Sequence, residues 1–404
     1  MSLNTTPSAE RIHIGIFGRR NAGKSSIINA ITGQKLAIVS HIAGTTTDPV
    51  YKAMELLPLG PVMIIDTPGL DDEGELGTLR VKKSLQVLSK TDIAILVTDC
   101  TQPLGEWEQQ LLKEFQDRRL PYILVRNKAD LLAQVPQPED THILYVSAEQ
   151  GTNIYALKER IAELKPVESE KLRIVGDLLD PMDFVILVVP IDKAAPKGRL
   201  ILPQQQTIRD VLEAGAVSVV VRDCELQDTL KQLGHRPKMV ITDSQVFAQV
   251  SAITPDDVLL TSFSILMARY KGDLSTVVAG VRAVDTLQDG DKVLISEGCT
   301  HHRQCDDIGT VKIPRWLEQF TGKKLEFCFT SGVEFPEDLS PYHMVVHCGG
   351  CMLNEKEMKN RLRRAQLQSI PITNYGVLLA YVNGILKRSL EPFPAIHALL
   401  EKNA

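Results

Sequence analysis

The sequence has no apolar run long enough to cross a bilayer and no large excess of charge of either sign. Apolar runs such as residues 184–189 are far shorter than the roughly 20 residues that a membrane-spanning helix needs. Lysine and arginine total 45 against 50 aspartates and glutamates, a formal charge of −5, which does not indicate a nucleic-acid or membrane-surface protein. Residues 1–11 contain no apolar segment of the signal-peptide kind. We therefore expect a cytoplasmic protein with no membrane and no nucleic-acid partner.

Disulfides are not expected either. Seven cysteines occur without an export signal, which favours a reducing compartment where cysteines serve as ligands or catalytic groups. The chain has 404 residues, of which 44% are apolar and 24% charged. This composition is typical of a soluble globular protein, and the length predicts two or three domains.

A phosphate-binding loop follows the first predicted strand. Residues 12–17 are a short, β-branched apolar run, which predicts a buried strand. Residues 18–25 then read GRRNAGKS, the G-x-x-x-x-G-K-S pattern, and a helical pattern follows. The glycines allow backbone N–H groups to surround phosphates at a helix N-terminus. We expect Lys24 to reach the β- and γ-phosphates and Ser25 to bind Mg²⁺.

Two further segments are expected on the Mg²⁺ side of this site. Residues 66–69 read DTPG after a predicted strand, so Asp66 is expected to hold the Mg²⁺ shell and the Gly69 amide to sense the γ-phosphate. Residues 44–48 read GTTTD and resemble switch I of the TrmE/Era-like GTPases, in which a threonine hydroxyl completes the Mg²⁺ shell. We assign that role to Thr46.

The guanine side is predicted by two more segments. Residues 127–130 read NKAD, and the Asp130 carboxylate can accept hydrogen bonds from guanine N1–H and N2–H₂, which adenine does not offer. Ser147 and Ala148 end a later strand and resemble the loop that backs the guanine. Four motifs in this order predict a GTP-binding domain. Its predicted nucleotide-binding residues are Asn21, Ala22, Gly23, Lys24, Ser25, Ser26, Asp66, Gly69, Asn127, Lys128, Asp130, Ser147 and Ala148, and the catalytic ones are Lys24, Thr46, Asp66 and Gly69.

Hydrolysis of GTP is expected to be slow and to be stimulated by a monovalent cation. Asn21 matches the asparagine that helps to bind K⁺ in potassium-dependent members, where K⁺ supplies the charge of an arginine finger. Leu70 stands where Ras-like enzymes have a water-orienting glutamine. An acidic residue of the segment 71–75 is an alternative aid to hydrolysis, although a solvated acidic loop explains these residues equally well.

The rest of the chain is also predicted to be α/β. A helical pattern over 153–164 ends the first domain, and a charged linker follows at 165–171. Strands and helices then alternate, which predicts βαβ units and mostly parallel sheets. We expect a P-loop GTPase domain at 1–167, followed by two further α/β domains at 172–267 and 268–404. The middle domain has no catalytic motif and is expected to be a spacer or an association surface.

Two clusters of metal-ligand residues follow predicted strands in the last third. Cys299 and His301 come just after the predicted strand 292–296, and His347, Cys348 and Cys351 come directly after a predicted strand at 344–346. If these strands are parallel neighbours, both clusters lie in the crevice where open α/β sheets bind ligands.

Two kinds of metal centre fit these residues. Three thiolates with a variable fourth ligand suit a [4Fe–4S] cluster with one exchangeable iron. A structural Cys₃His zinc site using His301 or His347 fits the spacing nearly as well. Each histidine can instead donate a hydrogen bond from outside the ligand set. The remaining cysteines, Cys100, Cys224, Cys305 and Cys328, are expected to be structural or spectator thiols.

Over essentially its whole length the chain resembles the HydF family of [FeFe]-hydrogenase maturation GTPases. The resemblance rests on the TrmE-like GTPase motifs, the acidic segment 71–77 and the Cys-x-His … His-Cys-x-x-Cys pattern. It implies an N-terminal GTPase, a middle dimerisation domain and a C-terminal domain that binds a [4Fe–4S] cluster. Cys299, Cys348 and Cys351 are the cluster cysteines that it implies. The fourth ligand stays open among His301, His347, Glu297 and an exogenous group.

The resemblance further implies a scaffold or carrier function. A di-iron precursor, assembled with two radical-SAM maturases, is delivered to the apo-[FeFe]-hydrogenase by a homodimer or higher oligomer. The expected cofactors are GTP, Mg²⁺, K⁺ and a [4Fe–4S] cluster. The alternative is a TrmE/Era-like GTPase of RNA modification or ribosome assembly with a zinc site in its C-terminal domain; the acidic charge balance argues against it.

Overall fold

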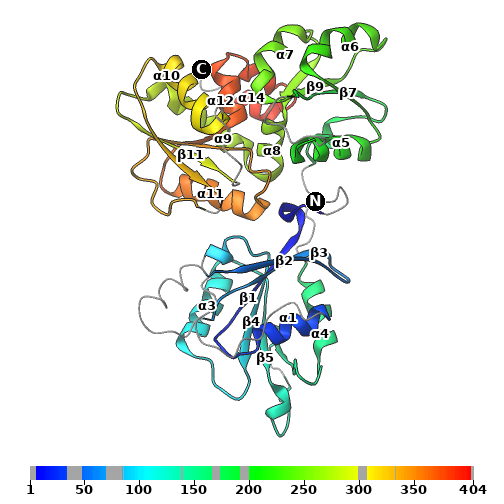
Figure 1. Ribbon diagram of the computed structural model, residues 1–404, viewed down its shortest axis with the longest axis vertical. Coiled ribbons are helices and arrows are strands. Elements are labelled where there is room, and N and C mark those ends of the chain that lie inside the picture. Colours follow the sequence, from blue (N-terminus) through cyan, green and yellow to red (C-terminus); the bar gives the residue numbers. More distant parts are fainter. Residues whose placement is uncertain are drawn as a thin grey trace. The chain divides into compact units, whose positions relative to one another are not determined.

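The computed structural model describes residues 6–33, 48–69, 84, 86–137, 140–165, 173–191, 200–298, 307–332 and 334–401. The chain forms two compact units, Met1–Ser169 and Glu170–Ala404 (Figure 1). Within the described residues, no helix has both the length and the apolar character needed to span a membrane.

The first unit is a sheet with the strand order β2-β3-β1-β4-β5-β6. All neighbouring strands are parallel except β2 and β3. The strands are β1 (Ile12–Phe17), β2 (Val50–Leu56), β3 (Gly60–Asp66), β4 (Ile93–Asp99), β5 (Tyr122–Asn127) and β6 (Ile143–Tyr145). Among the described residues of this unit, the helices that pack on the sheet are α1 (Lys24–Thr32), α3 (Glu106–Asp117) and α4 (Ile154–Glu163).

Helices cover both faces of this sheet. α1 and α4 contribute Ile28 and Leu157 to one hydrophobic core, while α3 contributes Phe115 to a second core on the opposite face. Figure 1 shows α1 and α4 on one side of the strands and α3 on the other. A strand buried on both faces reads as a continuous apolar run, which is why β1 begins and ends as predicted.

The second unit contains two all-parallel sheets, with strand orders β10-β9-β7-β8 and β12-β11-β13-β14. The first is built from β7 (Phe184–Val188), β8 (Val217–Val221), β9 (Met239–Thr242) and β10 (Leu259–Ser262). The second is built from β11 (Lys292–Glu297), β12 (Glu326–Ser331), β13 (Met344–His347) and β14 (Ile372–Asn374). One continuous hydrophobic core joins the two sheets.

The α-helices of this unit are α5 (Leu202–Glu213), α6 (Leu226–Gln232), α7 (Phe247–Ile253), α8 (Phe263–Lys271), α9 (Leu274–Gly280), α10 (Ile313–Thr321), α11 (Glu355–Leu367), α12 (Tyr375–Val382), α13 (Leu386–Ser389) and α14 (Pro394–Glu401). The predicted α/β class with mostly parallel sheets is confirmed. The proposed boundary at 267/268 falls within α8.

Two helical segments of the second unit contain other helix types. The 3₁₀ segment Val281–Thr286 follows α9, and a π turn at Ile308–Lys312 precedes α10. The edge strand β2 was not predicted, because most of its residues are exposed and no apolar run marks it.

Candidate functional site

The phosphate-binding loop connects β1 to α1. Gly18, with φ +146°, and Gly23, with φ +92°, have backbone conformations that side chains rarely adopt. A Cβ at Gly18 would lie 2.2 Å from the carbonyl oxygen of Val97, and one at Gly23 would lie 2.1 Å from the Asn127 side chain. The loop therefore packs against β4 and β5 so tightly that only glycine fits at these positions.

Lys24 begins α1 and is 9% exposed. Its ammonium donates hydrogen bonds to the backbone oxygens of Gly18 at 2.7 Å and Arg19 at 2.8 Å. Ser25 and Ser26 follow in the first turn of the helix. Asn21 has φ 59°, a left-handed conformation that asparagine tolerates better than most residues. The loop geometry thus places the predicted phosphate-binding residues together at a helix N-terminus.

The Mg²⁺ side of the site is described in part. Asp66 ends β3, and burial raises the pKa of its carboxyl, although the positive charges of Lys24 and Lys52 partly oppose this shift. A Cβ at Gly69 would lie 3.0 Å from the Arg20 nitrogen, so Gly69 lies against the phosphate-binding loop. The predicted Mg²⁺ ligand Thr46, together with Leu70 and the acidic segment 71–75, lies outside the described residues.

The two guanine motifs are joined to the phosphate-binding loop by Asn127. Its amide donates to the Ala22 carbonyl oxygen at 3.0 Å and accepts from the Ala148 N–H at 3.2 Å. The Ser147 hydroxyl donates to the Asp130 carboxylate at 2.5 Å. The structure therefore brings together three motifs that are far apart in sequence, and the hydrogen bond between Asn127 and Ala22 alone spans 105 residues.

One residue of this site was missed by sequence reasoning. Asp99, at the end of β4, accepts a hydrogen bond from Lys128 at 2.6 Å. Burial by itself raises the pKa of Asp99, but hydrogen bonds from Lys128 and Thr101 outweigh that effect and leave this pKa below its usual value. Asp99 thereby holds the side chain of Lys128, the second residue of the NKAD motif, in place. The position of Asp99 at the carboxyl end of a parallel strand, where such sheets bind ligands, could have identified it from the sequence.

The two cysteine clusters follow neighbouring strands, as predicted. β11 and β13 are parallel and adjacent, with Ser296 opposite His347. The Cys348 N–H donates to the Ser296 oxygen at 2.9 Å, extending the ladder by one residue. Cys299 and His301 lie outside the described residues, whereas Gly298, the residue before Cys299, is described.

Cys348 and Cys351 lie on a turn after β13 that we call the cysteine turn, residues 348–353. The Cys348 sulfur accepts hydrogen bonds from the N–H groups of Gly298 at 3.0 Å and Gly350 at 3.4 Å. Backbone N–H groups that point at sulfur stabilise a thiolate. This donor set fits a thiolate-ligated metal centre. Among the described residues alone, no group of three or more His, Cys, Asp and Glu side chains is arranged to hold a metal.

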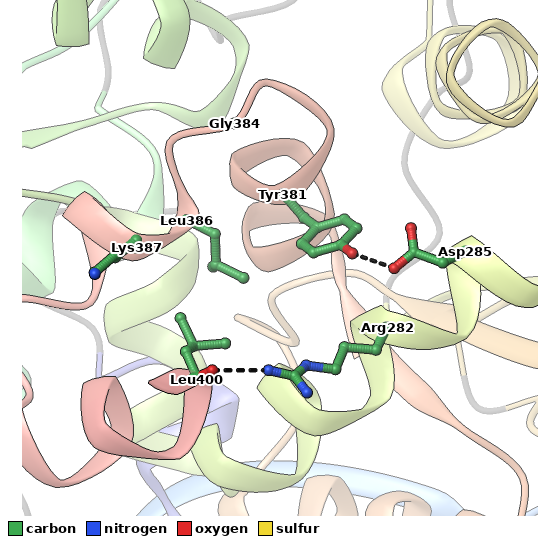
Figure 2. A pocket seen from close by; sticks show the side chains of 7 residues that line it. All are labelled: Arg282, Asp285, Tyr381, Gly384, Leu386, Lys387 and Leu400. Carbon is green, nitrogen blue, oxygen red and sulfur yellow. Dashed lines mark hydrogen bonds between the residues drawn. The ribbon is translucent and has the colours of Figure 1, made fainter. Parts of the chain in front are cut away.

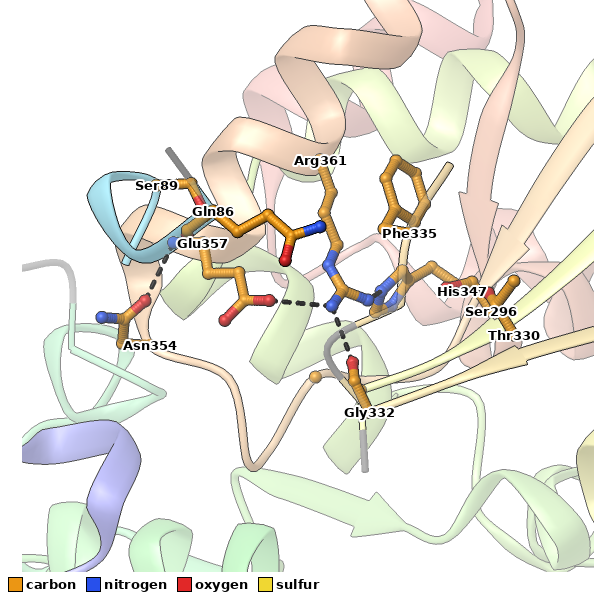
Figure 3. A network of polar contacts seen from close by, with 12 residues as sticks. Gln86, Ser89, Ser296, Thr330, Gly332, Phe335, His347, Asn354, Glu357 and Arg361 are labelled. Carbon is orange, nitrogen blue, oxygen red and sulfur yellow. Dashed lines mark hydrogen bonds and ion pairs between the residues drawn. The ribbon is translucent and has the colours of Figure 1, made fainter. Parts of the chain in front are cut away.

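His347 is fully buried, and both of its ring nitrogens are hydrogen-bonded. Figure 3 shows its ring beside the Arg361 guanidinium. Nε2 faces Arg361 Nη1 at 3.0 Å, and Nδ1 lies 2.7 Å from the Cys348 oxygen. Because a guanidinium only donates, Nε2 is the acceptor and Nδ1 carries the proton. This geometry agrees with the alternative in which the histidine is not a metal ligand and donates a hydrogen bond from outside the ligand set.

Arg361 is itself held on several sides. It forms an ion pair with Glu357 at 2.8 Å, and both side chains are almost fully buried. It also donates to the Gly332 oxygen at 2.8 Å and stacks 5.1 Å from the Phe335 ring centre (Figure 3). Neither Arg361 nor Glu357 was predicted, because α11 carries no recognised motif.

Glu297 ends β11 and is 9% exposed. The Tyr375 hydroxyl donates to its carboxylate at 3.3 Å. Burial, followed by the negative charge of Glu297, raises the pKa of Tyr375, so this phenol stays protonated as a donor. Of the other cysteines, Cys100 is buried, Cys224 is exposed and Cys328 is half-buried in β12; Cys305 lies outside the described residues.

A separate cavity of about 410 Å³ lies between α12, α13, α14 and the 3₁₀ segment Val281–Thr286 (Figure 2). Its polar groups are already paired: Tyr381 donates to Asp285, and Arg282 donates to the Leu400 oxygen at 3.0 Å. Burial and the Asp285 hydrogen bond raise the pKa of Tyr381 to about 12. No predicted site residue lines this cavity.

Comparison with known families accounts for most of the chain. Residues 275–392 match the hydrogen maturase F (HydF) tetramerization domain, and residues 174–272 match the hydrogen maturase F dimerization domain. Residues 13–128 match the 50S ribosome-binding GTPase model. The chain belongs to the HydF family. Its first unit is a P-loop GTPase domain that binds GTP and Mg²⁺, and its two HydF domains indicate a homo-oligomer.

Curated relatives match the GTPase part. GTPase Der of Wolinella succinogenes is 33% identical over 42% of this chain and 38% of its own length. GTPase Era of Carboxydothermus hydrogenoformans is 34% identical over 38% of this chain and 55% of its own. The tRNA modification GTPase MnmE of Legionella pneumophila is 36% identical over 40% of this chain and 37% of its own length. The chain thus spans about half or less of these relatives.

Among solved structures, a variant of Aquifex aeolicus Era bound to GDP.AlF4- matches 55% of this chain and 98% of that chain at 21% identity, with a TM-score of 0.34. A probable GTP-binding protein engB matches 38% of this chain and 97% of its own at 25% identity, with a TM-score of 0.28.

Proposed function

We propose that this HydF-type protein is a GTPase scaffold that binds a [4Fe–4S] cluster and delivers a di-iron precursor to an apo-[FeFe]-hydrogenase. The observation that supports this most strongly is the cysteine turn at the joined ends of β11 and β13, in a chain that also has a complete set of guanine and phosphate motifs. In the alternative, a GTPase of RNA modification or ribosome assembly, the same cysteines would hold only a structural zinc ion.

In the nucleotide site, Lys24 leaves the Gly18 and Arg19 oxygens to bind the β- and γ-phosphates. Ser25 and Thr46 bind Mg²⁺, Asp66 orders its water shell, and the Gly69 amide reports the γ-phosphate. Asn21 contributes to a K⁺ site that supplies positive charge during a slow hydrolysis.

In the second unit, the proposed cluster ligands are Cys299, Cys348 and Cys351. The bound cluster would supply an iron with an exchangeable position. His301, Glu297 and an exogenous group are the favoured fourth ligands. His347 is the less favoured one, since both its ring nitrogens already have partners.

The proposed partners are two radical-SAM maturases and the apo-hydrogenase, and the proposed location is the cytoplasm. Four of the five residues of β8 are valines, and β8 lies at the edge of its sheet with Val220 43% exposed. An apolar edge strand favours pairing with another chain, which supports assembly through the dimerization domain.

Anaerobic purification and reconstitution, followed by metal analysis and EPR, tests the cluster. Iron with acid-labile sulfide and a broad visible absorption is the expected result. One colourless zinc per chain would overturn the carrier function in favour of a zinc-stabilised GTPase.

The role of the nucleotide is tested separately. We propose that GTP controls partner binding or release, so hydrolysis rates measured with and without each maturase and the hydrogenase should differ. Identical rates throughout would contradict this role.

A further inference from the structure

In and around the cysteine turn, backbone N–H groups face the Cys348 sulfur, whereas the carbonyl oxygens of the two cysteines face side-chain donors. The N–H groups of Gly298 and Gly350 point at the Cys348 sulfur. The carbonyl oxygens of Cys348 and Cys351 instead accept hydrogen bonds from side chains, namely from His347 at 2.7 Å and from Lys271 at 2.8 Å. Both cysteines thus have their carbonyl groups fixed by donors outside the turn.

Lys271 holds the Cys351 side. It is the last residue of α8, is 2% exposed, and also donates to the Leu353 oxygen at 3.2 Å. Removing an ammonium from water is costly unless its environment compensates. The Cys351 and Leu353 oxygens supply part of that compensation, so the buried Lys271 amine is committed to the turn.

Arg361 holds the Cys348 side through His347. It fixes the ring so that Nδ1–H faces the Cys348 oxygen, while Glu357 and the Gly332 oxygen fix the guanidinium (Figure 3). The glutamate neutralises this guanidinium. The Arg361 side is therefore mainly positional.

We propose that Lys271 and Arg361 are positioning residues of the cysteine turn, one on each side, and that Lys271 also offsets the negative charge of metal-bound thiolates. This inference rests on the proposed cluster site. Hydrogen bonds to sulfur and local charge set the reduction potential of an iron–sulfur centre. A positive charge favours the reduced, more negative state, so losing it makes the potential more negative.

The first experiment uses the metal-free full chain. Hydrogen–deuterium exchange of peptides covering 347–353 is compared for wild type, K271M and R361K, with K324M as the matched control because Lys324 is exposed in the same unit. We expect exchange about tenfold faster in K271M and a smaller increase in R361K, with no change in K324M. Wild-type exchange in both K271M and R361K would overturn the proposal.

The second experiment is a redox titration of the reconstituted cluster, followed by EPR. K271M should have a more negative potential than wild type, and K271R, which keeps the charge and the donors, should restore it. A purely structural lysine would give K271M and K271R the same potential, which would remove the charge role. If K271M does not fold, R361K still carries the exchange test, and wild-type exchange in R361K would then overturn the proposal.

The outcomes separate this proposal from the proposed function. A wild-type chain that binds no cluster, with faster exchange in K271M, rejects the cluster and keeps the positioning role. A wild-type cluster with K271M indistinguishable from K324M in both exchange and potential rejects the positioning role and keeps the cluster.

Discussion

Two buried lysines occupy comparable places in the two units. Lys24 and Lys271 each donate to two backbone oxygens of a glycine-containing turn at the carboxyl ends of parallel strands. The difference is where each lysine comes from. Lys24 is five and six residues from its acceptors, whereas Lys271 is 80 and 82 residues away.

This difference corresponds to two kinds of function. Lys24 bonds to its own loop. Phosphate oxygens would offer it a better, charged acceptor, so we propose that its hydrogen bonds are exchanged when GTP binds. Lys271 bonds to a turn from a separate helix and is nearly inaccessible. It is suited to holding one geometry, with or without a ligand.

The largest effect is expected from removing a thiolate at the cysteine turn. Cys348→Ser should reduce reconstituted iron and sulfide to background, because a serine hydroxyl is not deprotonated as a thiol is. Cys328→Ser is the matched control, since Cys328 is half-buried in β12. Retention of the cluster in the Cys348 variant, or equal loss in both variants, would contradict the assignment.

The next largest effect concerns the local lysine. Lys24→Ala should lower kcat/KM for GTP hydrolysis by about 10²–10³-fold, since one preorganised charge at the phosphates is lost. Lys113→Ala, at an exposed position of α3, is the control. Steady-state phosphate release gives the hydrolysis rates of the two variants. Equal rates for Lys24→Ala and Lys113→Ala would show that Lys24 does not act on the phosphates.

Guanine recognition should be affected somewhat less. Asp130→Asn keeps one acceptor oxygen and removes the other, so one charged hydrogen bond worth about 1.5–3 kcal/mol is lost, and GTP binding should weaken by about 10- to 150-fold. Asp117→Asn, exposed on α3, is the control. Calorimetric titration with GTP decides, and unchanged affinity in the Asp130 variant would exclude its guanine contact.

The smallest effect is expected at His347, and it distinguishes a histidine that hydrogen-bonds to the cysteine turn from a histidine that ligates the metal. The amide of asparagine lies near the position of Nδ1, so His347→Asn keeps the donor to Cys348, while the amide of His347→Gln lies near Nε2. If His347 supports the turn, the asparagine variant should retain iron within about twofold and the glutamine variant should lose several-fold more. Equal losses in the two variants would favour His347 as a ligand.

Much of the GTPase domain could be predicted because its signals are local. The motif of residues 18–25 contains both the lysine and the glycines that its loop requires, and β1 was predicted to the residue. The meeting of β11 and β13 was also predictable, since parallel strand ends share one edge of a sheet.

The support of the cysteine turn could not be predicted in the same way. Lys271 lies at a helix end that resembles any other basic helix terminus, and Arg361 lies on α11 among other charged residues. Only folding brings them to the turn. Asp99 likewise reaches Lys128 across neighbouring strands, β4 and β5.

We propose that the cysteine turn belongs to an iron–sulfur site. Mössbauer spectroscopy of the full chain, reconstituted anaerobically with ⁵⁷Fe, decides whether iron is bound there. We expect the quadrupole doublets of a [4Fe–4S] cluster with one iron distinct from the other three, and their absence in Cys348→Ser. A spectrum without cluster-bound iron, in a chain that instead retains a single zinc ion, would contradict this proposal.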